Sequence, residues 1–416
     1  MRRFCASFAL SVLVIIVGGC GSLPVQEAAL TGDKALVEKE VMSSKDLPEA
    51  APGLTSKSTL QDYLVYAALN NPGLKAAFLN WEAALEKIPQ VTALPDPNFS
   101  YGWFIQTMMN QHESFALEQT FPWFGKLKLQ GDAAAEAARA EKARFEAAKL
   151  KLFYQVKDAY YEYYYLARAI AVTKENLGYA KYLESVARAG YGAGLVPYSD
   201  VIRTQVELGK LEDSVKTLDD QAGPVAARLN AALNRPPDGA LYWPEKIAQE
   251  KASFTSGQLS AWLKEFNPEL AAMDFEAAEA KWQIARAKKD YYPDITLGMQ
   301  GVSMLQGKDA VVAMASVNLP VWRSKYRAEV NEATAKYESL LKQRRDRENS
   351  LAADVKFADY KFRDADRKVA LYLGALIPEA KQAFAVSLQA YQTGKETYKN
   401  RAVKHLRGCI GRDVSC

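Results

Sequence analysis

The chain is poor in the residues that most often build metal sites and catalytic centres. Its 416 residues contain four cysteines and two histidines, His112 and His405. No cysteine lies between Cys20 and Cys409, so the body of the chain has no internal disulfide. Two histidines leave no familiar zinc spacing and few candidates for a general base. We therefore expect no metal and no cofactor, and we do not expect an enzyme.

The body of the chain also has no large excess of positive or negative charge. The net charge of +4 comes from the ends, because residues 1–19 contribute +2 and residues 395–416 contribute +4. Residues 20–394 are left with −2. A nucleic-acid-binding surface needs a strong basic excess, so we expect no nucleic acid partner.

The N-terminus has the pattern of an export signal. Two arginines precede an apolar run at residues 8–17, which is too short to span a bilayer. The run leads into VGGC, residues 17–20, which resembles a bacterial lipobox, where the chain is cut before a cysteine that is then lipidated. This resemblance implies a signal peptide over residues 1–19, lipidation of Cys20, and a lipid-anchored linker over residues 20–58. The alternative is an ordinary secretory signal.

The chain contains a long internal repeat. Asn71-Pro72 recurs as Asn267-Pro268, at an offset of 196 residues. Such a recurrence, in a fixed order with other anchors, predicts a duplicated structural unit. We place the first copy at residues 59–235, a turn-rich connector at 236–258 and the second copy at 259–394. The other anchors are Pro97 with Pro293, Phe121-Pro122 with Leu319-Pro320, and Tyr191 and Gly194 with Tyr391 and Gly394.

Each copy has the same order of elements, which is a helix, a β-hairpin and a very long helix. The hairpins lie at residues 97–121 and 293–319, where apolar and polar side chains alternate with the period of a strand. The last strand, residues 311–319, is apolar on both faces, so its facing stays open. The apolar series is Phe99, Tyr101, Trp103, Ile105, Phe115, Leu117, Phe121, Ile295, Leu297 and Met299; the other series is Ser100, Gly102, Ser114, Ala116, Glu118, Thr120, Thr296, Gly298 and Gln300.

The helices are too long for a small globular core. Residues 131–189 contain no proline and would extend roughly 87 Å as one helix. Apolar residues recur at alternating steps of four and three from Leu152 to Ala180, and again from Leu351 to Leu376. A sustained repeat of 3.5 residues is typical of coiled coils. These helices are therefore expected to pack against lateral partners.

The hairpins also require partners if they lie in a membrane. Four strands cannot close a barrel, and an open edge in lipid leaves backbone groups without hydrogen bonds. Two copies of the chain would supply eight strands, and three would supply twelve, enough for a lumen. Hydrogen bonding alone leaves that choice open. Aromatic residues after the returning strands suit an interfacial belt, and these are Trp123, Phe124 and Trp322.

Several motifs resemble the TolC-like family of outer membrane efflux proteins, specifically its lipidated members. The resemblance rests on ALNNPGLKAA (68–77) and its echo FNPELAAMDFEAAEA (266–280), on LEQTFPWFGK (117–126) and its echo SVNLPVW (316–322), and on GYGAGLVPYSDV (190–201). It implies a mainly α-helical fold with membrane β-structure. In this fold three chains share a twelve-stranded barrel, continued by a tube of long coiled-coil helices.

The same resemblance implies a function and partners. The chain would be a passive export duct for drugs, metals or other small molecules across the outer membrane and periplasm. Its partners would be two further copies of itself, outer-membrane lipid, a periplasmic adaptor protein and an inner-membrane pump of the resistance-nodulation-division type. Gly21, where an inner-membrane lipoprotein would have aspartate, agrees with outer-membrane sorting. The alternatives are a periplasmic adaptor and a lipid-anchored coiled-coil scaffold without a pore.

The segment at residues 190–198 contains three glycines but is not a nucleotide site. Its glycines follow a helix and have the wrong third spacing for a dinucleotide fingerprint. Glycine ends helices and Pro197 suits the start of the next one, so the segment predicts a helical hairpin tip. Asp200 could simply stabilise the N-terminus of that helix. The resemblance instead assigns the periplasmic tips to Tyr191, Gly194, Tyr391 and Gly394, and a gate contact to Asp200 and Arg203.

Two other clusters have plainer interpretations. Met108, Met109 and His112 could bind a soft metal, but a loop between membrane strands explains them better. The tyrosines between residues 160 and 165 could stack on ligands, but helix packing is the favoured explanation.

The C-terminal tail departs from the resemblance. An acidic, leucine-rich turn and a final long helix would follow Gly394, but residues 395–416 show no apolar period. We interpret this tail as a frameshift or truncation, with a naturally short variant as the alternative. Loss of that helix would expose the stripe of the long helix that begins near Arg323 and weaken assembly of the trimer.

Overall fold

The computed structural model describes residues 53–105, 110–244, 247 and 254–392. These residues form two compact units, and each unit draws on both copies of the repeat. The first unit contains Ala76–Glu146 and Pro268–Asp346. The second contains residues 53–75, Ala147–Asn267 and residues 347–392. The long helices α5 and α9 each contribute to both units.

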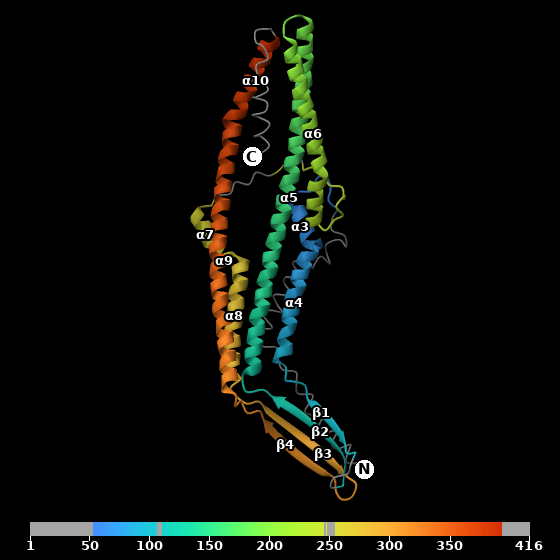
Figure 1. The fold of residues 1–416 in the computed structure, drawn as a ribbon, viewed down its shortest axis with the longest axis vertical. Helices are drawn as coiled ribbons and strands as arrows, with labels where there is room; N and C mark the ends of the chain where they lie inside the picture. Colours follow the sequence, from blue (N-terminus) through green and yellow to red (C-terminus); the bar gives the residue numbers. More distant parts are fainter. Residues whose placement is uncertain (1–52, 106–109, 245–246, 248–253, 393–416) are drawn as a thin grey trace. The chain divides into compact units, whose positions relative to one another are not determined.

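The first unit contains a single four-stranded antiparallel sheet with the order β1-β2-β3-β4 (Figure 1). The two hairpins lie next to each other because β2 of the first copy pairs with β3 of the second over most of its length. β1 and β4 are therefore the edges, and neither has a second neighbour within the described chain. The strands are β1 Asn98–Trp103, β2 Gln111–Phe121, β3 Ile295–Met304 and β4 Ala310–Val317.

Four helices accompany the sheet in the first unit. Helix α4 packs on α5 through an aromatic core in which Trp81 and Phe145 are both 0% exposed. The rings of Trp81, Phe78 and Phe145 form a mutual cluster, in which Trp81 lies 5.8 Å from Phe78 and 6.2 Å from Phe145 between centroids. Alanines 133, 135, 138 and 140 of α5 are also buried and allow neighbouring backbones to approach closely. The helices are α4 Pro72–Thr92, α5 Lys126–Gly192, α8 Pro268–Lys289 and α9 Arg323–Leu371.

In the part of the second unit that the structure describes, all regular elements are helices. The apolar stripe of α5 predicted from the sequence is confirmed from Leu152 to Thr173, where all its members are buried, whereas Leu177 and Ala180 at its end are half-buried. Tyr63 of α3 packs edge-on against Tyr160 of α5, 5.2 Å between ring centroids. Tyr163 stacks on Trp243 at 4.2 Å. Packing therefore explains the buried Tyr160 and Tyr163, whereas Tyr161 and Tyr165 are exposed. The helices are α3 Leu60–Asn70, α6 Tyr198–Ala232, α7 Ser256–Phe266, the π-turn η2 Tyr372–Leu376 and α10 Ile377–Gln392.

The first helix of each copy begins with the same capping arrangement. The backbone N–H of Thr59 donates to Asp62 Oδ2 at 2.6 Å before α3. At the same offset of 196 residues, the N–H of Thr255 donates to Gln258 Oε1 at 2.8 Å before α7. A side chain at the third helical position that returns to the cap residue is the capping box. The duplication therefore extends to the local chemistry that starts each copy.

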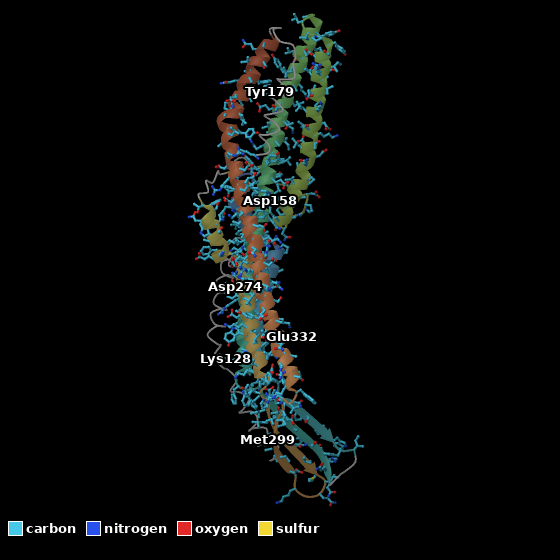
Figure 2. The ribbon with its side chains drawn as sticks, turned by 60° about the vertical axis from the view of Figure 1, so that its left-hand side comes forward. Lys128, Asp158, Tyr179, Asp274, Met299 and Glu332 are labelled. Atoms are coloured by element: carbon cyan, nitrogen blue, oxygen red, sulfur yellow. The ribbon has the colours of Figure 1, made fainter. Side chains whose placement is uncertain are left out.

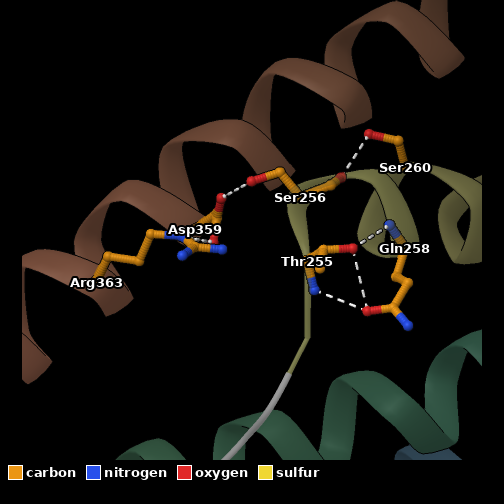
Figure 3. A network of polar contacts seen from close by, with 6 residues as sticks. All are labelled: Thr255, Ser256, Gln258, Ser260, Asp359 and Arg363. Carbon is orange, nitrogen blue, oxygen red and sulfur yellow. Dashed lines mark hydrogen bonds and ion pairs between the residues drawn. The ribbon is translucent and has the colours of Figure 1, made fainter.

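Helix α7 is bound to α9 by a polar network within the second unit (Figure 3). Ser256 Oγ donates to Asp359 Oδ2 at 2.6 Å, and Arg363 Nε donates to Asp359 Oδ1 at 2.8 Å. The hydrogen bond from Ser256, reinforced by that from Arg363, holds the pKa of Asp359 below its ordinary value. Phe254 and Phe362 add a ring contact of 5.3 Å beside the network.

We expect Asp359→Ala to loosen α7, because it removes the acceptor for Ser256 and the partner of Arg363. Amide hydrogen exchange over residues 256–266 would be faster in this variant. The lowered pKa means that the contribution of Asp359 is present above the ordinary pKa of the carboxyl and is lost as the pH falls through the lowered value. The protection of these amides in the wild type, taken relative to the intrinsic exchange rate at each pH, should therefore fall at acidic pH. The exposed Asp354→Ala is the matched control, and equal exchange in the two variants would rule out this role.

The long helix of the second copy differs from that of the first. None of the described residues of α9 is buried, in agreement with the expected exposure of its stripe. The predicted 3.5-residue repeat is wrong at its C-terminal end, because η2 is a π-turn in which Ile377 N–H donates to Tyr372 O. Pro378 lacks the N–H that Gly374 O would accept in an α-helix, which favours the wider turn. Among the described residues, the helical stretch Arg323–Ser387 contains an 18-residue window with a mean hydropathy of 1.2, which by length and composition alone could cross a membrane.

Candidate functional site

The register of the sheet separates an apolar face from a polar face. Phe99 lies opposite Leu117, and Leu117 lies opposite Met299, so the apolar series of all strands falls on one face. Met299 is opposite Ala313, which settles the facing of β4 and places Val311, Ala315 and Val317 on the apolar face. The alternation predicted from the sequence is confirmed. The other face carries Asn98, Ser100, Gly102, Ser114, Ala116, Glu118, Thr120, Thr296, Gly298, Gln300, Val302, Met304, Ala310, Val312, Met314 and Ser316.

The two faces differ in exposure and in bonding. Phe99, Tyr101 and Trp103 are each more than half exposed, so one sheet face presents large aromatic side chains to its surroundings. Figure 2 shows Met299 on the same sheet. On the polar face, Thr120 Oγ1 of the first repeat and Thr296 Oγ1 of the second repeat are hydrogen-bonded to each other at 2.9 Å. A sheet with an apolar face and a polar face matches the wall of a membrane barrel with a wet interior.

An ion cluster lies where the strands meet the helices. Lys126, the first residue of α5, places Nζ 2.9 Å from Asp294 Oδ1 and 3.2 Å from Asp290 Oδ1. The N–H of Trp123 donates to the same Asp294 oxygen at 2.7 Å. Burial lowers the pKa of Lys126, but its hydrogen bonds to Asp294 and Asp290 outweigh burial, and the pKa is raised. The cluster therefore holds the connection between β2 and α5 against the connection between α8 and β3.

The residues expected in the aromatic belt lie, like the ion cluster, where the strands meet the helices. Phe124 and Trp322 are exposed, at 78% and 74%. Trp123 instead stacks on Tyr292 at a centroid distance of 5.3 Å. Exposed aromatic side chains next to strand ends are typical of the interface between lipid and water.

The elbow between α5 and α6 is a tight helical hairpin. Helix α5 ends at Gly192 and α6 begins at Tyr198. Gly194 has φ of +72°, and the N–H of Leu195 donates to Gly190 O at 2.8 Å. A left-handed glycine that closes a helix end is the expected C-terminal stop. The rings of Tyr191 and Tyr198 lie 5.1 Å apart across the turn.

Asp200 and Arg203 lie together in the first turn of α6. Asp200 is 3% exposed, and its Oδ1 is 3.8 Å from Nη1 of Arg203, which is exposed. That separation is an ion pair but is too long for a hydrogen bond. The position also allows Asp200 to interact favourably with the positive end of the helix dipole. Beside the pair, Leu183 and Ala187 of α5 pack on Val201 of α6.

A second polar contact joins α5 to α6 near the elbow, and sequence reasoning did not find it. Glu184 Oε1 accepts hydrogen bonds from Arg188 Nη2 at 2.5 Å and from Gln205 Nε2 at 3.2 Å. The hydrogen bond from Arg188, and to a lesser extent that from Gln205, holds the pKa of Glu184 below its ordinary value. The spacing of Glu184 and Arg188 by four residues was a readable signal. The bond to Gln205 depends on how the hairpin folds back.

Several predicted residues cannot be assigned a contact. Cys20, Gly394, Met108 and Met109 lie outside the described residues, and only the backbone of Tyr391 is described, at the end of α10. His112 is described, and the prediction that it lies in the hairpin loop is wrong, because it is the second residue of β2. Its ring lies 4.2 Å from that of Trp103. Among the described residues, no group of three or more His, Cys, Asp or Glu side chains could hold a metal ion.

The chain matches known proteins over most of its described length. The family described as outer membrane efflux protein matches residues 64–235 and 261–400. Toxin and drug export protein A of Aggregatibacter actinomycetemcomitans is 24% identical over 265 residues, which are 63% of this chain and 54% of that protein. This chain therefore spans about half the length of that relative.

Solved structures are similar in fold. The outer membrane protein VceC of Vibrio cholerae has a TM-score of 0.72 at 17% identity, over 86% of this chain and 92% of that chain. The CmeC outer membrane channel of Campylobacter jejuni has a TM-score of 0.72 at 14% identity, over 86% of this chain and 81% of that chain.

Proposed function

Because the chain belongs to the outer membrane efflux protein family, we propose that it is the outer-membrane channel of a tripartite export system. In this role it is a passive duct, and the energy for transport is supplied by an inner-membrane pump. The proposal assigns it no catalytic step. The exported solutes would be drugs, metals or other small molecules selected largely by the pump.

One observation carries the proposal, which is the sheet with an apolar face, a polar face and two unpaired edges. An unpaired edge in lipid costs several kcal/mol for each unsatisfied backbone group. Pairing β4 of one molecule with β1 of the next removes both edges. Three molecules would give a twelve-stranded barrel with a lumen, and the polar face would line the water.

The remaining parts of the proposal concern location and partners. We place the chain in the outer membrane, anchored by a lipid on Cys20, with its helices extending into the periplasm. The elbow containing Tyr191 and Gly194 would contact a periplasmic adaptor, which links the channel to a pump of the resistance-nodulation-division type. The elbow's exposed tyrosines and its tight turn support a docking role.

The proposal is tested by reconstituting the purified full chain into planar bilayers. We expect an SDS-resistant trimer that migrates more slowly before heating than the monomer released by heating, and stepwise ionic currents. A monodisperse monomer that needs no detergent would contradict the channel and favour the alternatives, a periplasmic adaptor or a lipid-anchored scaffold. An adaptor is disfavoured by the sheet, because that class places one helical hairpin inside flanking β domains.

We also propose that Asp200 helps to close the periplasmic mouth. Asp200→Ala removes the ion pair with Arg203 and a carboxylate from a buried position. We expect a higher resting conductance in planar bilayers, since the elbows are then held less firmly. Arg203→Ala should act in the same direction. Asp213→Ala removes an exposed carboxylate from the same helix and is the matched control. An Asp200→Ala channel with wild-type resting conductance would defeat the gate assignment.

A further inference from the structure

The polar face of the sheet carries one formally charged side chain. Among its residues in the four described strands, only Glu118 is an Asp, Glu, Lys or Arg. The other members are hydroxyls, amides, glycines and small apolar side chains. The second carboxylate of the sheet, Glu113, is on the opposite face and accepts a hydrogen bond of 2.9 Å from Tyr101 Oη.

The neighbours of Glu118 leave its carboxylate open to the polar side of the sheet. Asn98 of β1 and Gly298 of β3 lie directly opposite it. Gly298 provides the room, because a Cβ built there would come within 2.9 Å of Glu118 Cγ. The carboxylate of Glu118 takes part in none of the side-chain hydrogen bonds or ion pairs formed among the described residues, and the residue is partly exposed. It lies three residues before the end of β2, about 10 Å from the level of the ion cluster.

From this placement we infer that Glu118 sets the charge preference of the lumen, favouring cationic over anionic solutes. The inference rests on the proposed channel, in which the polar face lines the water and the copies of Glu118 form a ring at one level. Rings of acidic side chains are a general way to select cations. No basic residue of the polar face in the described strands offsets this ring.

The expected size of the effect depends on salt. For three carboxylates about 10 Å from the axis of a twelve-stranded barrel, screened Coulomb attraction changes the cation-to-anion permeability ratio about fourfold in about 0.1 M salt. The change exceeds about tenfold near 0.01 M, where the Debye length is about 30 Å, and nearly vanishes at about 1 M. A wide pore therefore selects through the long-range field of Glu118, without binding the solute.

The test compares reversal potentials of the reconstituted full chain across a potassium chloride gradient, from about 0.1 M to about 0.01 M. We expect Glu118→Gln to lower the potassium-to-chloride permeability ratio about fourfold or more, and Glu118→Lys to make the channel prefer chloride. Glu113→Gln removes a carboxylate from the same strand but from the other face, so it should leave the ratio unchanged.

The outcomes separate this inference from the channel itself. If the wild-type chain carries no current, the proposed function fails. If it conducts but Glu118→Gln and Glu118→Lys keep the wild-type ratio, the channel stands and the role of Glu118 is overturned. An equal loss in Glu113→Gln would also overturn it, because charge on the strand would then matter irrespective of face. Heat-modifiable migration of each variant shows that the trimer has formed.

Discussion

Lys126→Met is expected to lower the free energy of unfolding by about 3 kcal/mol. The lysine side chain is 9% exposed and faces both Asp290 and Asp294. Its removal leaves the partly buried Asp294 without this cation and leaves Asp290 with Arg286, at 3.8 Å. Removing one partner of a buried ion pair typically costs about 3 to 5 kcal/mol, and partial exposure of the aspartates reduces the cost. Urea unfolding of the detergent-solubilised protein, followed by circular dichroism at fixed protein concentration, measures the change.

Two comparisons make this prediction specific. Lys128→Met changes an exposed lysine on the same helix (Figure 2) and should shift stability by less than about 0.5 kcal/mol. Adding Asp290→Asn and Asp294→Asn to Lys126→Met should recover part of the loss, because the uncompensated charges are gone. Equal losses for Lys126→Met and Lys128→Met would mean that the cluster adds nothing to stability.

Trp81→Ala should destabilise the first unit by about 3 to 5 kcal/mol, the range for truncating a buried aromatic side chain. The Trp81 ring is fully buried and contacts both Phe78 and Phe145, so its loss leaves a cavity between α4 and α5. Urea unfolding under the same conditions measures the change. A loss below about 1 kcal/mol would show that these helices repack around the gap.

Trp81→Phe separates packing from polarity. The indole Nε1 of Trp81 is buried and has no hydrogen-bond partner among the described residues. A smaller aromatic ring without this N–H would retain much of the packing and remove an unsatisfied donor. We therefore expect a far smaller loss for Trp81→Phe than for Trp81→Ala. Trp262→Ala, at an exposed position of α7, is the surface control.

The sequence was sufficient for the features that depend on period and order. Alternation at residues 99–103 and 295–299 predicted strands, and the structure places those side chains on one face as expected. The stripe of α5 and the glycine turn at Gly194 were also readable, since each follows from local spacing. The repeat anchors located both hairpins because a duplication preserves order.

Features that depend on distant parts of the chain were not readable. Lys126 meets Asp290 and Asp294 more than 160 residues later, and nothing local to any of them specifies that meeting. The facing of β4 followed only from its pairing with β3, since its own residues are apolar on both sides. The π-turn at residues 372–376 interrupts a stripe that the heptad spacing continued, because Pro378 acts on the preceding turn.

The central pairing of β2 with β3 has a consequence for assembly. Three of the seams between strands form inside one molecule, so joining a ring of such molecules requires a single intermolecular seam per chain. A chain with only one copy of the repeat would supply one hairpin, so every second pairing between strands in the ring would join two separate molecules. Each additional molecule that must be recruited adds an entropic cost to assembly. Cleavage between the copies, within residues 236–258, would turn that covalent advantage into a concentration-dependent association.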